Sequence, residues 1–464
     1  MTAAEIRQRF DAQKRFFASG ATRSHEFRRS QLSQLERMLT EHEADIVEAL
    51  KADLGKSATE AYASEIGFLL AEIHHVQKHL PKWMKPHRVK TMFMHAPASS
   101  RIISEPLGVA AIFGTWNYPF QIMLSPLIGA LAAGNCALLK PSEISEHSAE
   151  LLERLVAEYF NPDVVTVISG GPEVAQLILA LPTNSIFFTG GAQVGRLVMQ
   201  ASAQHLIPCT LELGGKNPCI VDQDTDIRIT AKRIAFAKFF NSGQTCIAPD
   251  YILVHESVRS ELIAELCKAL LEFYGADPAA SPDYGRIVSD RHFQRLVALL
   301  DRGRIVHGGE HDAAVRFIAP TIVDEVTWDD PIMQEEIFGP LLPVRSYRSI
   351  DDAVAQMKRH PTPLALYCFS RNRRVADEFI SRISSGTVCI NGALSQVASF
   401  TLPFGGVGSS GMGRYHGRHG FDTFSHSRAV LRRSFRFDSG KMYPPYETSM
   451  PFFKRMLSLL FRHY

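Results

Sequence analysis

The sequence predicts an α/β fold made of two parallel-sheet units and a small extended arm. From residue 107 to residue 215, short apolar runs alternate with helical segments, which is the pattern of buried strands joined by crossover helices. A second alternation of this kind follows "GGKNP" at 214–218 and continues to residue 391. With 464 residues, the chain also exceeds the size of one ordinary hydrophobic core, so more than one domain is expected.

The first 55 residues have the spacing of amphipathic helices. Side chains recur on one helical face in two series, which are Ile6, Phe10, Gln13 and Phe17, and then Leu32, Leu35, Leu39, Ile46 and Leu50. We expect these helices to pack on the outside of a larger unit.

Five apolar runs mark the strands of the first unit, namely "GVAAIFG", "CALLKP", "VVTVISGG", "SIFFTGG" and "CTLELGG". Helical segments lie between them, near 120–133, 145–160, 172–180 and 192–204. In open parallel sheets, ligands bind at the carboxyl ends of the strands, and each of these runs ends in glycine, proline or polar residues. The sequence therefore predicts a binding site at that edge of the sheet.

The second unit is predicted to contain a helix at 226–240, a strand at 250–254, a helix at 257–274 and further strands ending with "GTVCIN" at 386–391. Residues 84–106, which include "KPHRVKTMFMHAPASSRIISEP", have the character of an extended excursion and not of a core element. We interpret this stretch as an arm that crosses to a partner subunit.

Charge and composition exclude several classes of function. Lys and Arg number 50 against 48 Asp and Glu, and a net charge of +2 offers no electrostatic footprint for nucleic acid. The seven cysteines have no paired spacing typical of a zinc site or a disulfide framework, so we predict no metal and a cytoplasmic setting. The charged N-terminus does not resemble a signal peptide, and no apolar stretch is long enough to predict a membrane-spanning helix.

The stretch "NSGQTC", 241–246, places Cys246 after a turn of small and polar residues. A lone cysteine is most often a buried structural thiol. A loop with exposed backbone amides and little apolar cover favours instead a thiol that can ionise and be reached. Cys246 is therefore a candidate nucleophile.

A thiol nucleophile needs a base and a donor for the oxyanion, and two strand ends supply candidates. Glu212 in "LELGGK" is either a paired structural acid or a base whose pKa is raised by partial burial, which would favour proton acceptance near neutral pH. Asn117 in "GTWNYPF" ends another strand, where its side-chain amide is either a local turn donor or an oxyanion donor.

Two further strand ends suggest a nucleotide site. Lys140 and Glu143 in "LLKPSE" either face solvent or bind ribose hydroxyls at the mouth of the sheet. In "FTGGAQVG", 188–195, Gly190 and Gly191 would let the backbone approach a pyrophosphate at a helix N-terminus. Because Ala192 breaks the G-x-G-x-x-G pattern, this glycine turn alone is not diagnostic.

Seven motifs occur in one order along nearly the whole chain, namely "WNYP", "KPSE", "FTGG", "LELGGKNP", "GQTC", "EEIFGP" and "PFGGVGSSGMGRYHG". Together they resemble the aldehyde dehydrogenase superfamily. The segment "GQTCIAPDY", the "YHG…FSH" run and "MYPPY" are most similar to its class 3 branch, which includes fatty and aromatic aldehyde dehydrogenases.

The resemblance implies a role for each candidate residue. Cys246 matches the nucleophile, Glu212 the general base and Asn117 the oxyanion donor. The implied cofactor positions are Lys140 and Glu143 at the adenosine ribose, Gly190, Gly191 and Gly195 in the phosphate turn and the helix that follows it, the backbone of Leu213 at the nicotinamide carboxamide, Glu336 at the nicotinamide ribose and Phe338 beside it.

The resemblance also implies how the chain divides and what it does. A Rossmann-like dinucleotide-binding domain would comprise 1–83 and 107–211, an oligomerisation arm 84–106, a second α/β catalytic domain 212–391, and a C-terminal arm and return segment 392–464. The implied reaction is NAD(P)-dependent oxidation of an aldehyde to a carboxylic acid through a Cys246 thiohemiacetal and thioester. The implied assembly is a homodimer.

Glu143 favours NAD over NADP, because a carboxylate accepts a hydrogen bond from a free 2′-hydroxyl and repels a 2′-phosphate. Class 3 relatives often accept both cofactors. In addition, the family's Gly-Ser-Thr phosphate turn is Gly190-Gly191-Ala192 here, so two hydroxyls that could contact phosphate are missing.

Three rival functions are compatible with a reactive cysteine in this sequence. A cysteine hydrolase would pair Cys246 with one of the 18 histidines and have no redox step. A CoA-acylating dehydrogenase would transfer the acyl group to CoA, which needs no water-activating Glu212. A catalytically retired binding protein is disfavoured because Cys246, Glu212 and Asn117 are all intact.

The C-terminal segment "MPFFKRMLSLLFRHY", 450–464, is amphipathic, with Phe452, Phe453, Met456, Leu457 and Leu460 on one helical face and Lys454, Arg455 and Arg462 elsewhere. It either packs on its own subunit or a dimer partner, or lies in a membrane interface. It is too short to span a bilayer.

Overall fold

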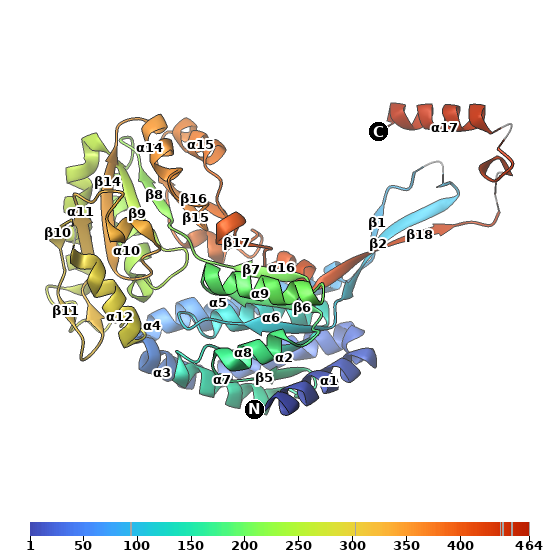
Figure 1. Cartoon of the computed structure of the whole chain (residues 1–464), viewed down its shortest axis with the longest axis horizontal. Helices are drawn as coiled ribbons and strands as arrows, with labels where there is room; N and C mark the ends of the chain where they lie inside the picture. Colours follow the sequence, from blue (N-terminus) through green and yellow to red (C-terminus); the bar gives the residue numbers. More distant parts are fainter. Residues whose placement is uncertain (93–94, 302, 437, 439, 447–448, 464) are drawn as a thin grey trace.

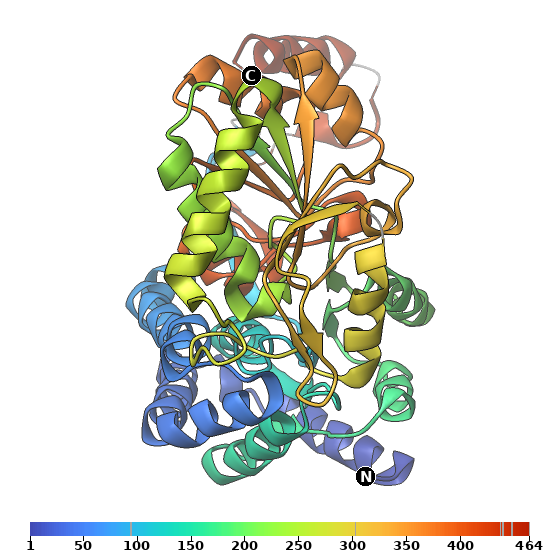
Figure 2. The same ribbon diagram turned by 90° about the vertical axis from the view of Figure 1, so that its left-hand side faces the viewer.

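The structure is a computed structural model that describes residues 1–464 except 93–94, 302, 437, 439, 447–448 and 464. Two α/β bodies lie side by side, and a narrow arm projects from one of them (Figure 1). Turned by 90°, the molecule presents the second body above the N-terminal helices (Figure 2). The predicted α/β class, with two parallel sheets and an arm, is confirmed.

The first body is built on a six-stranded sheet with the order β17-β7-β6-β3-β4-β5. Its parallel strands are β3 (Val109–Phe113), β4 (Cys136–Lys140), β5 (Val165–Val167), β6 (Ser185–Thr189) and β7 (Cys209–Glu212). The connecting helices are α6 (Gln121–Ala133), α7 (Glu146–Tyr159), α8 (Pro172–Leu179) and α9 (Ala192–Gln204). Each lies within a segment that the sequence predicts, because strands covered by helices on both faces need continuous apolar runs.

The direction in which strands are added reverses at β3. Strands β4 and β5 follow on one side of β3, whereas β6 and β7 lie on the other side. In doubly wound sheets a crevice opens at the carboxyl ends of the strands where this reversal occurs. The loops that contain Asn117 and Gly190 start at this point.

The N-terminal helices pack on the outside of this sheet, as expected. They are α1 (Ala3–Ala18), α2 (His25–Glu41), α3 (Glu43–Leu54), α4 (Ala58–Ala61) and α5 (Gly67–Trp83), with a π-helical turn at Tyr62–Ile66. Ile6 and Phe10 are buried in the apolar core of the sheet. Gln13 is also buried, and its Nε2 donates to the carbonyl oxygen of Ala137 on β4 at 2.9 Å, which explains a polar side chain on this helical face.

The second body is built on a seven-stranded sheet with the order β10-β13-β14-β9-β8-β15-β16, parallel except for the β10–β13 pair. The strands are β8 (Pro218–Val221), β9 (Tyr251–His255), β10 (Arg304–His307), β13 (Thr321–Asp324), β14 (Leu341–Tyr347), β15 (Ala365–Phe369) and β16 (Thr387–Ile390). The helices are α10 (Ile227–Phe239), α11 (Arg259–Tyr274), α12 (Asp290–Val297), α13 (Pro331–Gln334), α14 (Ile350–Met357) and α15 (Arg373–Arg382). A short antiparallel pair, β11 (His311–Asp312) and β12 (Phe317–Ile318), lies beside them.

After β16 the chain returns to the first body. Strand β17 (Gly411–Met412) pairs antiparallel with the edge of β7, and α16 (Gly417–Thr423) then packs on α6. The two helices approach closely through glycines, since a Cβ on Gly129 would lie 3.0 Å from the carbonyl carbon of Gly420. The C-terminal segment therefore completes the sheet that carries Glu212.

The arm is a three-stranded antiparallel sheet of β1 (His87–Val89), β2 (Ala98–Pro106) and β18 (Ser425–Arg433). The excursion predicted at 84–106 thus forms one part of the arm, and the C-terminal segment supplies the rest.

Helix α17 (Met450–His463) lies beyond the arm, apart from both bodies (Figure 1). The side chains of Leu460 and Arg462, which belong to the predicted amphipathic pattern, lie outside the described residues. None of the described helices is both long and apolar enough to cross a membrane.

Candidate active site

A cavity of about 530 Å³ lies between the two bodies. The loops after β3, β6 and β7 line it from the first body, and the segments after α10 and β16 line it from the second. Its wall is largely apolar and aromatic, with Phe68, Trp116, Tyr118, Ile122, Phe236, Phe240, Ile247, Val397, Phe404 and Tyr415. A few polar groups converge in this apolar setting, as is typical of a small-molecule site.

The cavity brings together most of the residues predicted from the sequence. Asn117, Gly190, Gly191, Glu212, Leu213, Cys246, Glu336 and Phe338 all line it. Lys140, Glu143 and Gly195 lie outside its wall, at the end of β4, in the loop that follows it and in α9 respectively.

The Cys246 loop is buried, so the expectation of an exposed loop is wrong. The loop lies between the two bodies, where side-chain amides take the place of water. Asn217 Nδ2 donates to the carbonyl oxygen of Cys246 at 2.8 Å, and Gln244 Nε2 donates to that of Arg286 at 3.0 Å. Gly243 has a φ of 73°, and a Cβ there would lie 2.2 Å from the carbonyl oxygen of Gly339, so only glycine fits.

The thiol of Cys246 is a weak acid in this setting. Its pKa is raised to about 12, chiefly by burial and secondly by the negative charges of Glu336 and Glu212, against a smaller opposite effect from the backbone N–H groups of Cys246 and Ile247. A thiolate, and not a thiol, is the nucleophilic form. Burial and, to a smaller extent, neighbouring charge therefore control how readily Cys246 ionises.

Asn117 presents its side-chain amide in a defined orientation. The hydroxyl of Thr115 donates to Asn117 Oδ1 at 2.6 Å, and Asn117 Nδ2 donates to the carbonyl oxygen of Gln244 at 3.0 Å. Because an amide nitrogen carries two hydrogens, one remains available to an oxygen atom in the cavity. Asn117 is thus suited to stabilise a negative oxygen next to the Cys246 loop.

Glu212 ends β7, where it pairs with Thr189 of β6 and Gly411 of β17. Burial alone raises the pKa of its carboxyl group well above the usual range. Neither carboxylate oxygen has a hydrogen-bond partner among the described residues. A carboxylate with high proton affinity and free oxygens at a cavity wall is suited to accept a proton.

The segment that carries Glu336 and Phe338 is held from behind by a buried ion pair. Lys216 Nζ contacts Asp250 Oδ2 at 2.6 Å and also donates to the carbonyl oxygen of Glu335, while Asp250 Oδ1 accepts the backbone N–H of Ile337. The Phe338 ring lies edge-on to Trp116, with centroids 5.3 Å apart.

Glu336 itself is packed against the glycines that end β7. A Cβ on Gly214 would lie 2.0 Å from Glu336 Oε2, so a side chain at position 214 would displace the Glu336 carboxylate. Burial raises the pKa of Glu336 to about 8, and the backbone N–H of Gly215 partly offsets this effect. Its other oxygen, Oε1, has no hydrogen-bond partner in the described structure.

The ends of β4 and β6 form a surface suited to a nucleotide. Lys140 Nζ contacts Glu143 Oε2 at 2.7 Å. A Cβ on Gly191 would meet nothing within 4 Å, so open space lies beside the N-terminus of α9, which attracts anions. Gly195 lets α9 approach β7, because a Cβ there would lie 2.8 Å from Leu213 Cδ2. Lys140 and Glu143 can form hydrogen bonds with ribose hydroxyls, and the N-terminus of α9 attracts phosphate, so this surface fits a dinucleotide.

Comparison with known proteins identifies the family. The model of the aldehyde dehydrogenase family matches residues 1–430 of this chain. The chain belongs to the aldehyde dehydrogenase family. The resemblance recognised from seven short motifs is therefore confirmed.

Related aldehyde dehydrogenases match over nearly their full length. The chain is 47% identical to the 4,4'-diaponeurosporen-aldehyde dehydrogenase of Staphylococcus aureus (strain NCTC 8325 / PS 47), covering 97% of this chain and 98% of that protein. It is 47% identical to the dimeric NADP-preferring aldehyde dehydrogenase of Canis lupus familiaris, covering 92% and 95%. The solved substrate-bound state of Staphylococcus aureus AldH matches with a TM-score of 0.96 and 46% identity, covering 97% of this chain and 99% of that one.

Family 3 aldehyde dehydrogenases are also similar, which agrees with the class 3 features of the sequence. Member B1 from Bos taurus is 48% identical over 90% of this chain and 89% of that protein. The comparisons give no support to the cysteine hydrolase or the CoA-acylating dehydrogenase.

Several cavity residues of this aldehyde dehydrogenase were not predicted from the sequence. His292 and Arg295 on α12 line the wall next to Trp116 and Glu336. His292 is the kind of residue that a cysteine hydrolase would need, but its ring packs edge-on to Trp116 at 4.8 Å and its Nδ1 faces the Ser289 hydroxyl at 2.8 Å. No short motif marks this helix, so only the fold reveals it.

Tyr415 is a further unpredicted residue of the wall. It lies within electrostatic range of both Glu212 and Cys246, and its ring packs on Phe187 at 4.9 Å. It does stand in the motif "GMGRYHG", so the sequence contained a signal for it.

The rate at which iodoacetamide alkylates Cys246 in this aldehyde dehydrogenase should depend on the charges around the thiol, because only the thiolate reacts. Because the thiol pKa is about 12, its alkylation rate should keep rising from about pH 7 to about pH 10 and not level off near the ordinary cysteine pKa. Above about pH 8, where Glu336 is mostly ionised, Glu336→Gln removes one nearby negative charge and should raise the rate at fixed pH several-fold. Peptide mass spectrometry measures the rate, with Cys267 on α11 as an internal control. An equal change at both cysteines would contradict the electrostatic explanation.

Proposed function

We propose that this aldehyde dehydrogenase oxidises an aldehyde to a carboxylic acid with NAD(P)⁺, and that Cys246 carries the acyl group as a thioester. The observation that supports this is the convergence of Cys246, Asn117 and Glu212, from three distant chain segments, on one largely apolar cavity. A nucleophile, an oxyanion donor and a base are the three groups that acyl transfer through a thiol requires.

In the first step, the Cys246 thiol gives its proton to water, the thiolate sulfur attacks the carbonyl carbon, and the carbonyl oxygen becomes an oxyanion. The second amide hydrogen of Asn117 and the backbone N–H of Cys246 are the donors for it, because Gln244 occupies only one hydrogen of the Asn117 amide. These donors are in place before the reaction begins, so little reorganisation is needed.

Bound NAD(P)⁺ supplies the hydride acceptor for the redox step. Lys140 and Glu143 would hold its adenosine ribose, and Gly190 and Gly191 with the N-terminus of α9 its pyrophosphate. The remaining cofactor contacts would come from Glu336 and Phe338 at the nicotinamide ribose and from the backbone of Leu213. In this proposal, residues 1–83 and 107–211 form the cofactor domain and 212–391 the catalytic domain.

The thioester is then hydrolysed by a water molecule that Glu212 activates. Its raised pKa lets it take a proton from water near neutral pH, and its free oxygens face no competing donor among the described residues. The acid leaves, and the Cys246 thiol is regenerated.

The apolar wall favours an aldehyde with an aliphatic or aromatic body. Phe68, Ile122, Phe236 and Val397 offer contact area without hydrogen-bonding groups. Small polar aldehydes would gain little from such a surface, so we propose medium or long aliphatic and aromatic aldehydes as substrates.

We further propose a cytoplasmic homodimer in which the arm contacts the partner subunit. The arm extends away from both bodies (Figure 1), and on the isolated chain β18 is mostly exposed and β2 is partly exposed. Relatives of this chain are named dimeric. Helix α17 would then pack on the partner, and contact of its apolar side chains with a membrane surface is the alternative.

Asn117→Ala should lower kcat about 100- to 1000-fold, because one preorganised oxyanion donor is lost. Single-turnover and steady-state kinetics measure the loss, and thermal unfolding checks the fold. Asn135→Ala removes an equally buried amide outside the cavity, so it should cost stability without lowering kcat per titrated site. Full turnover by the Asn117 variant would remove its assigned role.

Glu212→Gln should separate the two halves of the reaction, and this experiment tests the proposed function as a whole. In stopped flow, one equivalent of NADH per active site should form rapidly, followed by slow turnover limited by thioester hydrolysis. The wild-type enzyme should give acid without CoA. A lack of any aldehyde-dependent NADH would overturn the proposal, whereas normal steady turnover by the variant would remove only the role of Glu212.

The wild-type enzyme should have a lower KM for NAD than for NADP, because the partly exposed Glu143 carboxylate can accept a bond from the 2′-hydroxyl. Glu143→Gln should shift kcat/KM toward NADP by roughly tenfold, which corresponds to about 1.4 kcal/mol. Glu146→Gln, an exposed glutamate in the first turn of α7, should leave the ratio unchanged. A wild-type preference for NADP, as in the names of some relatives, would contradict the proposed role of Glu143.

A further inference from the structure

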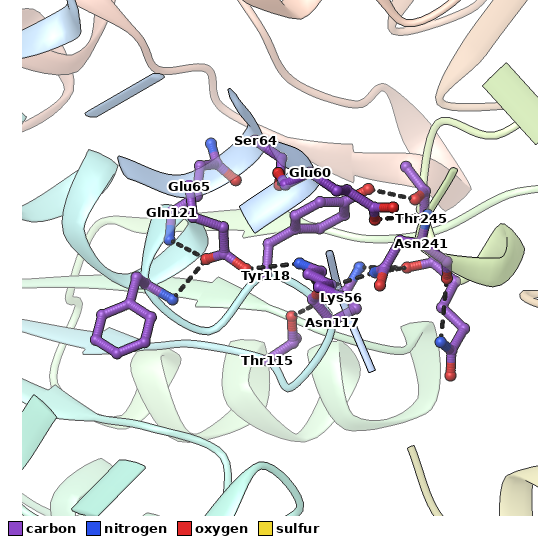
Figure 3. Close-up of polar contacts among 12 residues, drawn as sticks. Lys56, Glu60, Ser64, Glu65, Thr115, Asn117, Tyr118, Gln121, Asn241 and Thr245 are labelled. Carbon is purple, nitrogen blue, oxygen red and sulfur yellow. Dashed lines mark hydrogen bonds and ion pairs between the residues drawn. The ribbon is translucent and has the colours of Figure 1, made fainter. Parts of the chain in front are cut away.

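Three charged side chains of the segment 56–65, at and just before α4 and the π-helical turn, are buried next to the loops that line the cavity. Lys56 and Glu65 are 0% exposed, and Glu60 is 9% exposed. Burying a charge is costly unless it is paired and hydrogen-bonded, so each of these must have partners. Figure 3 shows that their partners belong to the two loops that carry Asn117 and Cys246. The reaction steps above give none of the three a role.

Glu65 fixes one end of the Asn117 loop. Its Oε2 accepts the backbone N–H groups of Phe120 and Gln121, each at 2.9 Å, at the point where α6 begins. Phe120 has no side chain that could cap this helix, so Glu65 supplies the missing acceptor from another part of the chain. The loop after β3 is thereby tied to the N-terminal helices.

Lys56 holds the middle of the same loop. Its Nζ contacts Glu65 Oε1 at 2.6 Å and donates to the backbone carbonyl oxygen of Asn117 at 3.0 Å. The ammonium group also lies 4.1 Å from the centre of the Tyr118 ring, a cation–π distance. The backbone of the proposed oxyanion donor is therefore held by a buried charge.

Glu60 reaches the Cys246 loop. Its Oε1 accepts the backbone N–H of Asn241 at 2.9 Å, where the backbone has a left-handed φ of 52°. The Asn241 side chain then donates from Nδ2 to the carbonyl oxygen of Asn117 at 2.8 Å. This carbonyl oxygen thus receives one hydrogen bond from Lys56 and one from the Cys246 loop, and it is the point where the two loops are joined.

The local backbone explains how one short segment serves both loops. A π-helical turn, Tyr62–Ile66, follows Glu60 and contains Glu65, and its wider winding brings residues five apart closer to one face than an α-helix would. Short π-helical insertions are found frequently at functional sites. Burial raises the pKa of Glu60 to about 7, so this carboxyl group is only partly ionised near neutral pH.

We propose that Lys56, Glu60 and Glu65 are positioning residues that clamp the Asn117 loop to the Cys246 loop, and so set where the Asn117 amide stands relative to the sulfur. Oxyanion donors act only within a narrow distance range, about 2.7–3.1 Å from the oxygen. A displacement of about 1 Å can cost roughly 100-fold in rate. This inference rests on the roles proposed for Asn117 and Cys246.

Two variants test the clamp in the full-length enzyme. Lys56→Met removes the donor to the Asn117 carbonyl oxygen and the partner of Glu65, whereas Glu65→Gln is milder because it keeps an oxygen for the amides of Phe120 and Gln121. Each should lower the first-turnover rate constant for NADH formation about 10- to 100-fold per titrated site. The KM for the cofactor should stay within about twofold, because the proposed cofactor residues lie in other segments.

Asp53→Asn is the matched control. Asp53 is a buried carboxylate of α3 that accepts the backbone N–H groups of His147 and Ser148 at the start of α7, outside the cavity wall. It should cost stability as Glu65→Gln does, but leave the first-turnover rate per titrated site unchanged.

The outcomes separate this inference from the proposed function. Equal first-turnover rates for wild type, Glu65→Gln and Asp53→Asn would overturn the clamp while Asn117→Ala still lost activity. If Asn117→Ala kept full activity, the proposed oxyanion donor itself would be wrong. Should Lys56→Met not fold, the comparison of Glu65→Gln with Asp53→Asn decides alone.

Discussion

Burial of polar groups between the two bodies is the constraint on which the site depends. The thiol of Cys246 and the carboxyl groups of Glu212 and Glu336 all have pKa values raised mainly by loss of contact with water. An apolar setting strengthens every charge interaction within it, so proton affinity and nucleophilicity there are set by a few neighbours. The same setting makes each unpaired polar group costly, and the surrounding fold must bear that cost.

In this structure, buried side chains form hydrogen bonds with the backbone N–H and C=O groups of the site loops, and these bonds offset the cost of burial. Asn217 and Gln244 hold the Cys246 loop, Glu65 and Lys56 hold the Asn117 loop, and Lys216 with Asp250 holds the segment of Glu336. In each case, the bonding side chain or ion pair bridges segments distant in the chain. Loops that would be mobile at a surface are thereby fixed in place, and reacting groups can be held in one geometry without help from regular secondary structure.

The parts that could be predicted from the sequence are those with local signals. Apolar runs mark β3 to β7, and glycine turns or polar residues mark their ends, so the strands and the candidates Cys246, Glu212 and Asn117 could be found. The burial of the Cys246 loop could not, because its cover comes from the other body. The role of Lys56 could not be predicted, because a lone lysine before a helix normally faces water. Its contact with Asn117, 61 positions away, is visible only in the fold.

Strand β7, which carries the proposed base Glu212, gains its edge partner β17 only late in synthesis of the chain. Strand β7 ends with Glu212, yet the strand that covers its outer edge comes from Gly411–Met412. While the chain emerges from the ribosome, N-terminus first, this edge stays open until Gly411–Met412 has been made, 199 positions after Glu212. An open edge can pair with a foreign strand, so a nascent or truncated chain is exposed to aggregation at the strand that bears Glu212.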